Sequence, residues 1–175
     1  MKRIFLIGYM ASGKTTLGGA LSKDTGLQFI DLDWYIEERM HRTVSELFAS
    51  KGESGFREIE KNMLHEAGEF ENVIIACGGG TPCFFDNMEY MNRMGTTVFL
   101  DVDPQVLFRR IKAAKSNRPL VANKAEDELM GTISQALEKR NPFYHRAKFI
   151  FDAGRLESRD QIDDSVHKLR DLLNI

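Results

Sequence analysis

Residues 8–15 follow the pattern G-x-x-x-x-G-K-[ST], with Gly8, Gly13, Lys14 and Thr15 at its fixed positions. Backbone N–H groups of such a loop, a P-loop, surround the β- and γ-phosphates of a nucleotide. Lys14 would add a positive charge beside those oxygens, and the Thr15 hydroxyl could ligate Mg²⁺. A chance glycine-rich turn is the alternative, but an apolar run precedes the loop and a helical pattern follows it. We therefore expect a nucleotide phosphate site here.

Two aspartates, Asp31 and Asp33, follow the second strand pattern of the chain. Ligands of open α/β sheets bind at the carboxyl ends of the strands. Asp33 could therefore orient an attacking hydroxyl group or accept its proton, and Asp31 could hold Mg²⁺ through water. Aspartates at strand ends are also common turn and N-cap residues, but the neighbouring phosphate site favours the functional interpretation.

Arg57 and Glu60 stand three residues apart in a helical pattern, so they share a helix face. Glu60 could hold the forked guanidinium group in place, and a fixed fork suits a carboxylate or phosphate of a substrate. An ion pair on the protein surface is the more common fate of such neighbours. The pattern alone does not separate the two interpretations.

Three further features could reach the same edge of the sheet. Gly78, Gly79 and Gly80 directly follow a strand pattern, which lets the backbone approach a ligand without an intervening side chain. Arg118 lies in an Asn-Arg-Pro-Leu segment and could close over a transferred phosphoryl group. Arg140 ends a long helical pattern and could reach the same cleft, although each arginine could equally be a solvated cation.

Strand and helix patterns alternate along the chain, which predicts an α/β class with a parallel sheet. Strand patterns cover residues 2–7, 28–31, 72–76, 96–101 and 148–152. Helical patterns cover residues 14–25, 34–40, 43–51, 55–69, 84–94, 104–114, 125–141 and 160–173. We expect Gly26 to end the first helix and Pro142 to stop the helix before it.

The length of 175 residues suits a single domain, residues 1–175. Two stretches exceed what the sheet requires. Residues 33–69 hold three helical patterns where one crossover helix would suffice, so we expect a substrate-binding insertion there. Residues 112–128 are rich in Lys, Ala and Asn and predict a mobile lid over the site.

Composition excludes several classes of partner. The net charge of −2 provides no basic field to attract nucleic acid or an anionic membrane. No apolar run approaches the roughly 20 residues of a membrane-spanning helix, and the first strand pattern begins where a signal peptide would stand. We expect a cytoplasmic protein, and nothing in the sequence demands a subunit interface, so we expect a monomer.

Taken in series, these residues resemble the shikimate kinase family. The motifs that carry the resemblance are Phe29-x-Asp31-x-Asp33-x-x-Ile36-Glu37, Gly52-Glu53-x-x-Phe56-Arg57-x-x-Glu60, the glycine triplet, Arg118-Pro119-Leu120, and Arg140 before Pro142, Tyr144 and Ala147. The resemblance runs from residue 1 to about residue 152. It implies a three-layer P-loop kinase fold, similar to nucleoside monophosphate kinases, with a five-stranded parallel sheet in the order 2-3-1-4-5. The implied reaction is ATP-dependent phosphorylation of the 3-hydroxyl of shikimate, with Mg²⁺.

The resemblance also implies a role for each candidate residue. Asp33 would bind the reacting hydroxyl and act in catalysis with Lys14 and Arg118. Arg57 and Arg140 would bind the carboxylate of shikimate, and Gly79 would contact the substrate through its backbone. The residues that contact ATP would be Ala11, Ser12, Gly13, Lys14, Thr15, Thr16, Arg110, Arg118 and Arg155. Thr15 would ligate Mg²⁺, with Asp31 as the second metal-site candidate.

The chain departs from the family pattern in the nucleotide site. Ala11 stands where the family usually has glycine, but its backbone N–H remains, so we expect little loss of phosphate binding. The segment from Arg110 to Arg118 is one residue longer than usual, and Arg110 is the matching candidate for stacking on adenine. Arg155 is the candidate contact from the adenine loop.

Two rival functions share parts of this pattern. A kinase for another small acid, such as gluconate, or for a nucleotide would have the same fold, but the chain lacks the Asp-Gly pair of adenylate-type kinases. A GTP-dependent regulatory module is the rival from another class. Residues 123–127 are one residue too long for Asn-Lys-x-Asp, and the chain has no Asp-x-x-Gly motif. Release of ADP with and without shikimate would separate these alternatives.

Overall fold

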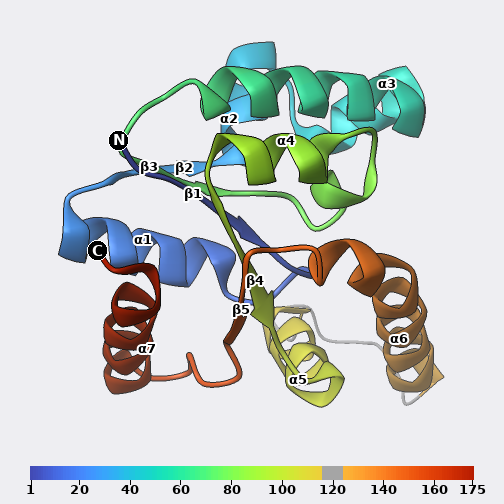
Figure 1. The fold of residues 1–175 in the computed structure, drawn as a ribbon. Coiled ribbons are helices and arrows are strands. Elements are labelled where there is room, and N and C mark those ends of the chain that lie inside the picture. The colour runs from blue at the N-terminus through green and yellow to red at the C-terminus, as the bar shows by residue number, and fades with distance from the viewer. Residues whose placement is uncertain (116–123) are drawn as a thin grey trace.

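The structure is a computed structural model that describes residues 1–115 and 124–175. Its centre is a five-stranded parallel sheet in the order β2-β3-β1-β4-β5 (Figure 1). The strands are β1 (Arg3–Ile7), β2 (Gln28–Asp31), β3 (Val73–Ala76), β4 (Thr96–Asp101) and β5 (Phe149–Asp152). This order confirms the predicted fold class, and each strand boundary lies within one residue of its predicted position.

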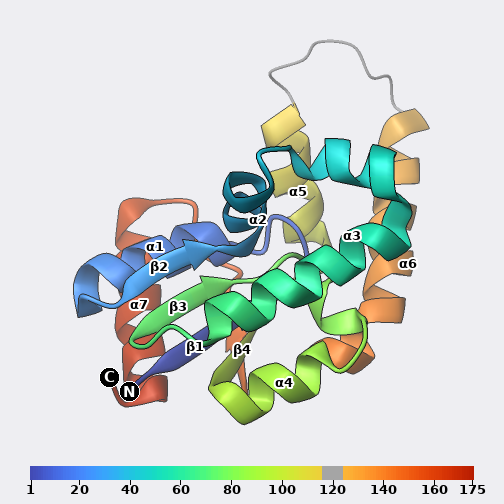
Figure 2. The same ribbon diagram turned by 90° about the horizontal axis from the view of Figure 1, so that it is seen from above.

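Helices cover both faces of the sheet. They are α1 (Lys14–Thr25), α2 (Leu32–Met40), α3 (Val44–Gly68), α4 (Asn87–Met94), α5 (Pro104–Lys115), α6 (Lys124–Tyr144) and α7 (Arg159–Leu173), with a short 3₁₀ helix η1 (Thr81–Cys83). Figures 1 and 2 place α3 and α4 on one face and α1 and α7 on the other. Helix α5 packs against α6. The result is the predicted three-layer arrangement.

Strand β1 is the centre of the core and the support of the P-loop. It pairs with β3 on one side and β4 on the other. Its residues Phe5, Leu6 and Ile7 are fully buried, because helices cover both faces of a parallel sheet and the strand reads as one apolar run. Its carboxyl end leads directly into the phosphate-binding loop, which therefore starts from a rigid position.

Helix α1 begins and ends at glycines in the left-handed region. Gly13 (φ 97°) is its N-cap and makes no side-chain capping hydrogen bond. Gly26 (φ 75°) ends it, as predicted, and its N–H donates to the carbonyl oxygen of Ser22. Because glycine has no side chain, the first N–H groups of α1 receive no side-chain cap from this residue.

The helical predictions were wrong in three places. Residues 43–51 and 55–69 form one helix, α3, with a kink at Gly52 (φ 69°, ψ 177°) that glycine tolerates. Helix α6 runs through Pro142 to Tyr144, because a proline so near the end removes only one intrahelical hydrogen bond. The segment 84–94 becomes helical only from Asn87, since Phe85 adopts a left-handed conformation (φ 50°).

Within residues 1–115 and 124–175, no helix is both long enough and apolar enough to cross a bilayer.

Candidate active site

The P-loop holds the ammonium group of Lys14 against its own backbone. Lys14 Nζ donates to the carbonyl oxygens of Gly8 and Tyr9, each at 2.8 Å. Burial lowers the pKa of Lys14 to about 8, although the negative side chains of Asp33 and Asp31 act to raise it. The group is still protonated near neutral pH, so it supplies a positive charge at the start of α1.

Ala11 has a strained backbone conformation. The sequence prediction considered only its retained N–H group and did not include this strain. Ala11 adopts a left-handed conformation with φ 62°, which costs a non-glycine residue on the order of 1 kcal/mol. Its carbonyl oxygen accepts a hydrogen bond from Arg110 Nη1 at 3.2 Å. The glycine that the family usually has here would adopt this conformation without strain.

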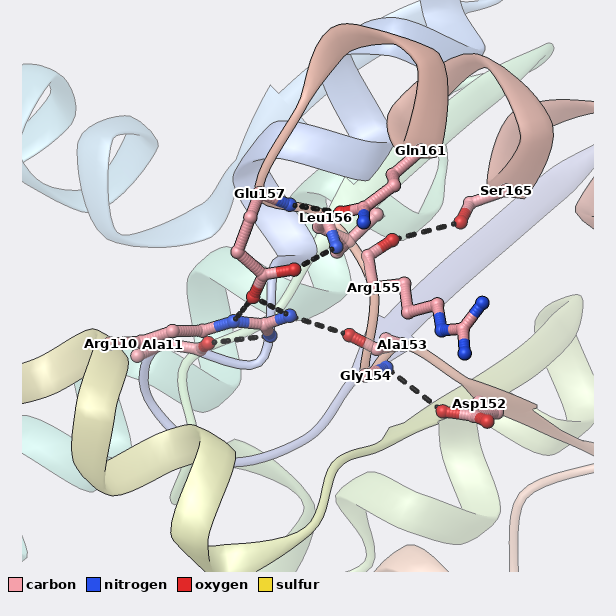
Figure 3. A network of polar contacts seen from close by, with 10 residues as sticks. All are labelled: Ala11, Arg110, Asp152, Ala153, Gly154, Arg155, Leu156, Glu157, Gln161 and Ser165. Carbon is pink, nitrogen blue, oxygen red and sulfur yellow. Dashed lines mark hydrogen bonds and ion pairs between the residues drawn. The ribbon is translucent and has the colours of Figure 1, made fainter.

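A cleft of about 350 Å³ lies beside the P-loop and contains most of the predicted ATP contacts. Its lining residues are Ala11, Gly13, Lys14, Thr15, Thr16, Arg110, Leu156 and Glu157. Leu156 and Glu157 were missed by the sequence reasoning, which singled out Arg155. Figure 3 shows the side chain of Arg155 pointing away from Arg110 and Glu157. Ser12, within the loop, is almost fully buried.

Asp31 caps the start of α2, which was the alternative to a role in metal binding. It also contacts the P-loop. Its Oδ1 accepts hydrogen bonds from the N–H groups of Asp33 and Trp34 at the start of α2, at 3.1 and 3.4 Å. Its Oδ2 accepts from the Thr15 hydroxyl at 2.8 Å. The two predicted metal-site residues are therefore in direct contact with each other.

The donor set of this pair fits Mg²⁺ bound together with a nucleotide. Mg²⁺ prefers oxygen ligands and usually combines one or two protein oxygens with substrate phosphates and water. The hydroxyl of Thr15 and the carboxylate of Asp31 are such oxygens, at the mouth of the phosphate loop. The described residues contain no group of three or more His, Cys, Asp or Glu side chains that could bind a metal unaided.

Asp33 lies two residues after Asp31, in an electrostatic environment that favours the protonated acid. Burial, together with the carboxylates of Asp31 and Glu60, raises the pKa of Asp33 to about 6, although Lys14 acts in the opposite sense. A carboxyl group with this pKa can accept a proton near neutral pH and release it again.

The pair Arg57 and Glu60 is buried, so it is not the surface ion pair that the sequence left open. Arg57 is 8% exposed and Glu60 is 1% exposed. Arg57 Nη1 donates to Glu60 Oε1 at 2.9 Å, and Glu60 Oε2 accepts from the Thr81 hydroxyl at 2.8 Å. The Arg57 guanidinium also lies 4.2 Å from the ring centroid of Phe84. Thr81 and Phe84 gave no local signal in the sequence, because they follow the glycine triplet and reach α3 only through the fold.

The glycine triplet brings the candidate acceptor-site residues together. A Cβ added at Gly78 would lie 3.2 Å from Asp33 Oδ1, and one at Gly79 would lie 3.0 Å from Arg140 Nη1. A Cβ added at Gly80 would lie 2.5 Å from Arg57 Nη2. Side chains from α2, α3 and α6 thus meet around one three-residue segment at the carboxyl end of β3.

The same segment touches the phosphate loop. A Cβ on Gly79 would lie 3.5 Å from the carbonyl oxygen of Gly8 and 3.6 Å from the backbone nitrogen of Met10. The Tyr144 hydroxyl donates to the Gly79 carbonyl oxygen at 2.5 Å, and Arg140 lies 5.5 Å from the ring centroid of Tyr9. One carboxylate and two guanidinium groups are therefore adjacent to the P-loop. Arg118 lies outside the described residues.

Comparisons with known proteins identify the family. The family model described as shikimate kinase matches residues 10–170. A shikimate kinase of Bacteroides fragilis is 65% identical over 175 residues, covering 100% of this chain and 98% of the relative. The crystal structure of shikimate kinase from Bacteroides thetaiotaomicron has a TM-score of 0.92 and 59% identity, with 99% of each chain covered.

A third protein was solved with a ligand. The structure of shikimate kinase from Acinetobacter baumannii in complex with shikimate has a TM-score of 0.81 and 28% identity, covering 99% of this chain and 94% of the other. The full-length matches confirm the predicted enzyme class together with the predicted family. The chain belongs to the shikimate kinase family.

Proposed function

We propose that this enzyme transfers the γ-phosphoryl group of ATP to the 3-hydroxyl of shikimate, with Asp33, Arg57 and Arg140 as its acceptor site. The observation that carries this assignment is the convergence of these three side chains around the glycine triplet beside the P-loop. One carboxylate suits a hydroxyl group, and two guanidinium groups suit a carboxylate. The shikimate complex of the Acinetobacter baumannii relative supports the same choice of acceptor.

The nucleotide end of the reaction rests on the P-loop and the cleft beside it. The uncapped start of α1 and the ammonium group of Lys14 favour the β- and γ-phosphates. Arg110 lines the same cleft, and the family pattern makes it the candidate contact for the base. The contacts assigned to Ser12, Gly13, Thr16 and Arg155 remain predictions from the family pattern.

Mg²⁺ is the cofactor that we assign, with Thr15 and Asp31 as its protein ligands or their water-bridged neighbours. When bound, it would offset charge on the phosphate oxygens. Binding of Mg²⁺ would weaken the hydrogen bond between Thr15 and Asp31, because the same oxygens would face the ion. Asp31 would meanwhile keep capping α2 through its other oxygen.

Asp33 would orient the attacking hydroxyl and accept its proton late in the transfer. Its raised pKa supports this role, because the carboxylate is basic enough to take a proton near neutral pH. Arg118 would approach the transferred group from the segment that we expect to act as a lid. By analogy with other phosphoryl-transfer arginines, its loss should lower kcat on the order of 10³-fold or more.

Arg57 would bind the shikimate carboxylate with donors that the protein leaves unused. Its Nε is buried without a hydrogen-bond partner among the described residues. Its Nη2 reaches only Glu53, at 3.4 Å. A buried arginine with spare donors beside a second arginine favours an anionic ligand.

Release of ADP from ATP, measured with and without shikimate, tests the proposed function. We expect release that depends on shikimate, with stoichiometric appearance of shikimate 3-phosphate. Gluconate and nucleoside monophosphates complete the panel. Equal activity with gluconate would show that shikimate is not the specific acceptor. Slow GTP hydrolysis without any acceptor would favour the regulatory module. The cytoplasmic location and the monomeric state remain predictions.

A further inference from the structure

The guanidinium group of Arg110 is held by three acceptor residues from two segments of the chain, the P-loop and the loop after β5. Its Nε and Nη2 both lie 2.9 Å from Glu157 Oε1. Its Nη1 donates to the Ala11 carbonyl oxygen at 3.2 Å, and its Nη2 donates to the Ala153 carbonyl oxygen at 2.9 Å. Figure 3 shows this arrangement, with Arg110 reaching from α5 between the P-loop and the loop after β5. Each nitrogen of the fork has an acceptor, which fixes the plane of the group.

Glu157 is itself fixed by the loop that carries it. Its Oε2 accepts a hydrogen bond from the Leu156 N–H at 2.8 Å, and its own N–H donates to Gln161 Oε1 at 2.9 Å. The next residue, Ser158, is the N-cap of α7. Although partial burial acts to raise it, these hydrogen bonds and Arg110 keep the pKa of Glu157 below its usual range. The carboxylate is therefore ionised and oriented independently of any ligand.

The position of Glu157 is unfavourable for an unpaired carboxylate. It lines the same cleft as Lys14 and the P-loop, where the phosphates of a nucleotide would bring further negative charge. Pairing with Arg110 neutralises it, and the adjacent Leu156 packs so closely that a Cβ on Gly13 would lie 2.3 Å from its Cδ1. The pair therefore forms a fixed part of the cleft lining.

We propose that Glu157 is a positioning residue for ATP, which acts by holding Arg110 in the orientation that receives the nucleotide base. The inference rests on the proposed function, in which Arg110 contacts ATP. Glu157 does not touch the reacting atoms. Its effect should appear in nucleotide affinity and not in affinity for shikimate, because the acceptor site is built from other elements.

The pair differs from an ordinary surface ion pair in the burial of its arginine. The Arg110 side chain is 16% exposed and that of Glu157 is 53% exposed, whereas in the Arg170–Asp24 pair the arginine is 39% and the aspartate 36% exposed. The Arg170–Asp24 pair has the same 2.9 Å separation and also involves α7. Asp24→Ala is consequently a matched control that removes an ion pair of α7 away from the cleft.

The experiment compares the KM for ATP, the KM for shikimate and kcat in Glu157→Ala, Arg110→Ala, the double variant and Asp24→Ala. We expect Glu157→Ala to raise the KM for ATP roughly tenfold and to leave the KM for shikimate within about twofold of the wild type. The double variant should bind ATP no more weakly than Arg110→Ala, because Glu157 supports ATP binding only through that arginine. Glu157→Gln retains one acceptor oxygen and should recover part of the affinity. Asp24→Ala should behave as the wild type.

Equilibrium titration with ADP separates this inference from the proposed function. It measures the same loss of nucleotide affinity whether or not the enzyme phosphorylates shikimate. Equal changes in both KM values, an Arg110→Ala variant with normal nucleotide affinity, or a double variant worse than Arg110→Ala would each overturn the positioning role. If Glu157→Ala does not fold, Glu157→Gln carries the test, and unchanged ADP affinity in that variant together with unchanged affinity in Arg110→Ala would contradict it.

Discussion

Asp33 shows how a single residue can be held in an unfavourable state by its surroundings. Burial and two neighbouring carboxylates, Asp31 and Glu60, raise its pKa to about 6. The folded protein therefore binds the Asp33 proton more tightly than the unfolded chain does. By linkage, this group makes the free energy of unfolding fall as the pH rises from about 4 to about 6.

Asp33→Asn should remove that loss of stability. At acidic pH the two proteins should be similarly stable, because Asp33 is then protonated and resembles asparagine. Above about pH 6 the variant should be more stable by about 2 kcal/mol, while shikimate-dependent turnover falls on the order of 10²-fold or more. Urea unfolding across this pH range measures the difference. A stability difference independent of pH would show that the Asp33 carboxylate is not destabilised in the folded protein.

Arg57 offers a second prediction at the residue scale. Arg57→Lys keeps a positive charge beside the buried Glu60, so it avoids the cost of an unpaired buried carboxylate. It loses the fork that would bind a carboxylate in two places. We expect the KM for shikimate to rise about tenfold or more, with little change in the KM for ATP.

Isothermal titration calorimetry measures shikimate binding without relying on turnover. Titration of wild type and Arg57→Lys with shikimate gives the two dissociation constants directly. Equal effects on shikimate and ATP would contradict the role of Arg57 in binding the carboxylate.

At the scale of elements, the segment after β3 controls the spacing of the acceptor site. Gly80 has an ordinary backbone conformation (φ −89°), so its requirement for glycine is steric and not conformational. A Cβ there would lie 2.5 Å from Arg57 Nη2 and 2.9 Å from its Cζ. Because Glu60 holds the guanidinium group in place, the arginine cannot move without losing a buried ion pair.

Gly80→Ala should displace Arg57 and raise the KM for shikimate, with a loss of stability of about 1–3 kcal/mol. Gly19→Ala is the matched control, since no heavy atom lies within 4 Å of its added Cβ. In the middle of α1 that change should stabilise the protein by about 0.5–1 kcal/mol and leave both KM values unchanged. Similar kinetics in the two variants would show that the triplet does not position Arg57.

The elements themselves could be predicted well wherever a local signal was strong. Apolar runs located every strand, and Gly26 marked the end of α1. The continuation of α6 through Pro142 was not predictable, because the tertiary contacts of Tyr144 favour that last turn, for example its hydrogen bond to Gly79. The two helical patterns join in α3 through a kink at Gly52. In the sequence, a glycine at this position equally predicts the end of one helix and the start of another.

The site could be predicted to a similar extent. The family motifs indicated Asp33, Arg57 and Arg140, and the fold brings them to one place. The sequence could not show that Arg57 is buried, because that burial comes from Phe84 and Thr81 in a distant segment. It also could not distinguish Arg155 from Leu156 and Glu157 as the residues that line the cleft, since the orientation of a loop depends on its packing.

At the scale of the whole molecule, nucleotide binding should stabilise the fold by mass action. ADP with Mg²⁺ at about 100 times its dissociation constant should add about 2.7 kcal/mol, which raises Tm by roughly 5–10 °C in a protein of this size. Thermal melting at several ADP concentrations measures the shift. Lys14→Met should greatly reduce it, and a shift retained in full by that variant would contradict the P-loop assignment.

The central claim is that two arginines beside the P-loop recognise the carboxylate of shikimate. The most direct test compares kcat/KM for shikimate with kcat/KM for its methyl ester, in which that carboxylate is neutral. The account predicts that wild-type enzyme prefers shikimate on the order of 10²-fold or more, and that this preference shrinks in Arg57→Lys and Arg140→Ala. Equal kcat/KM values for acid and ester in the wild type would contradict it.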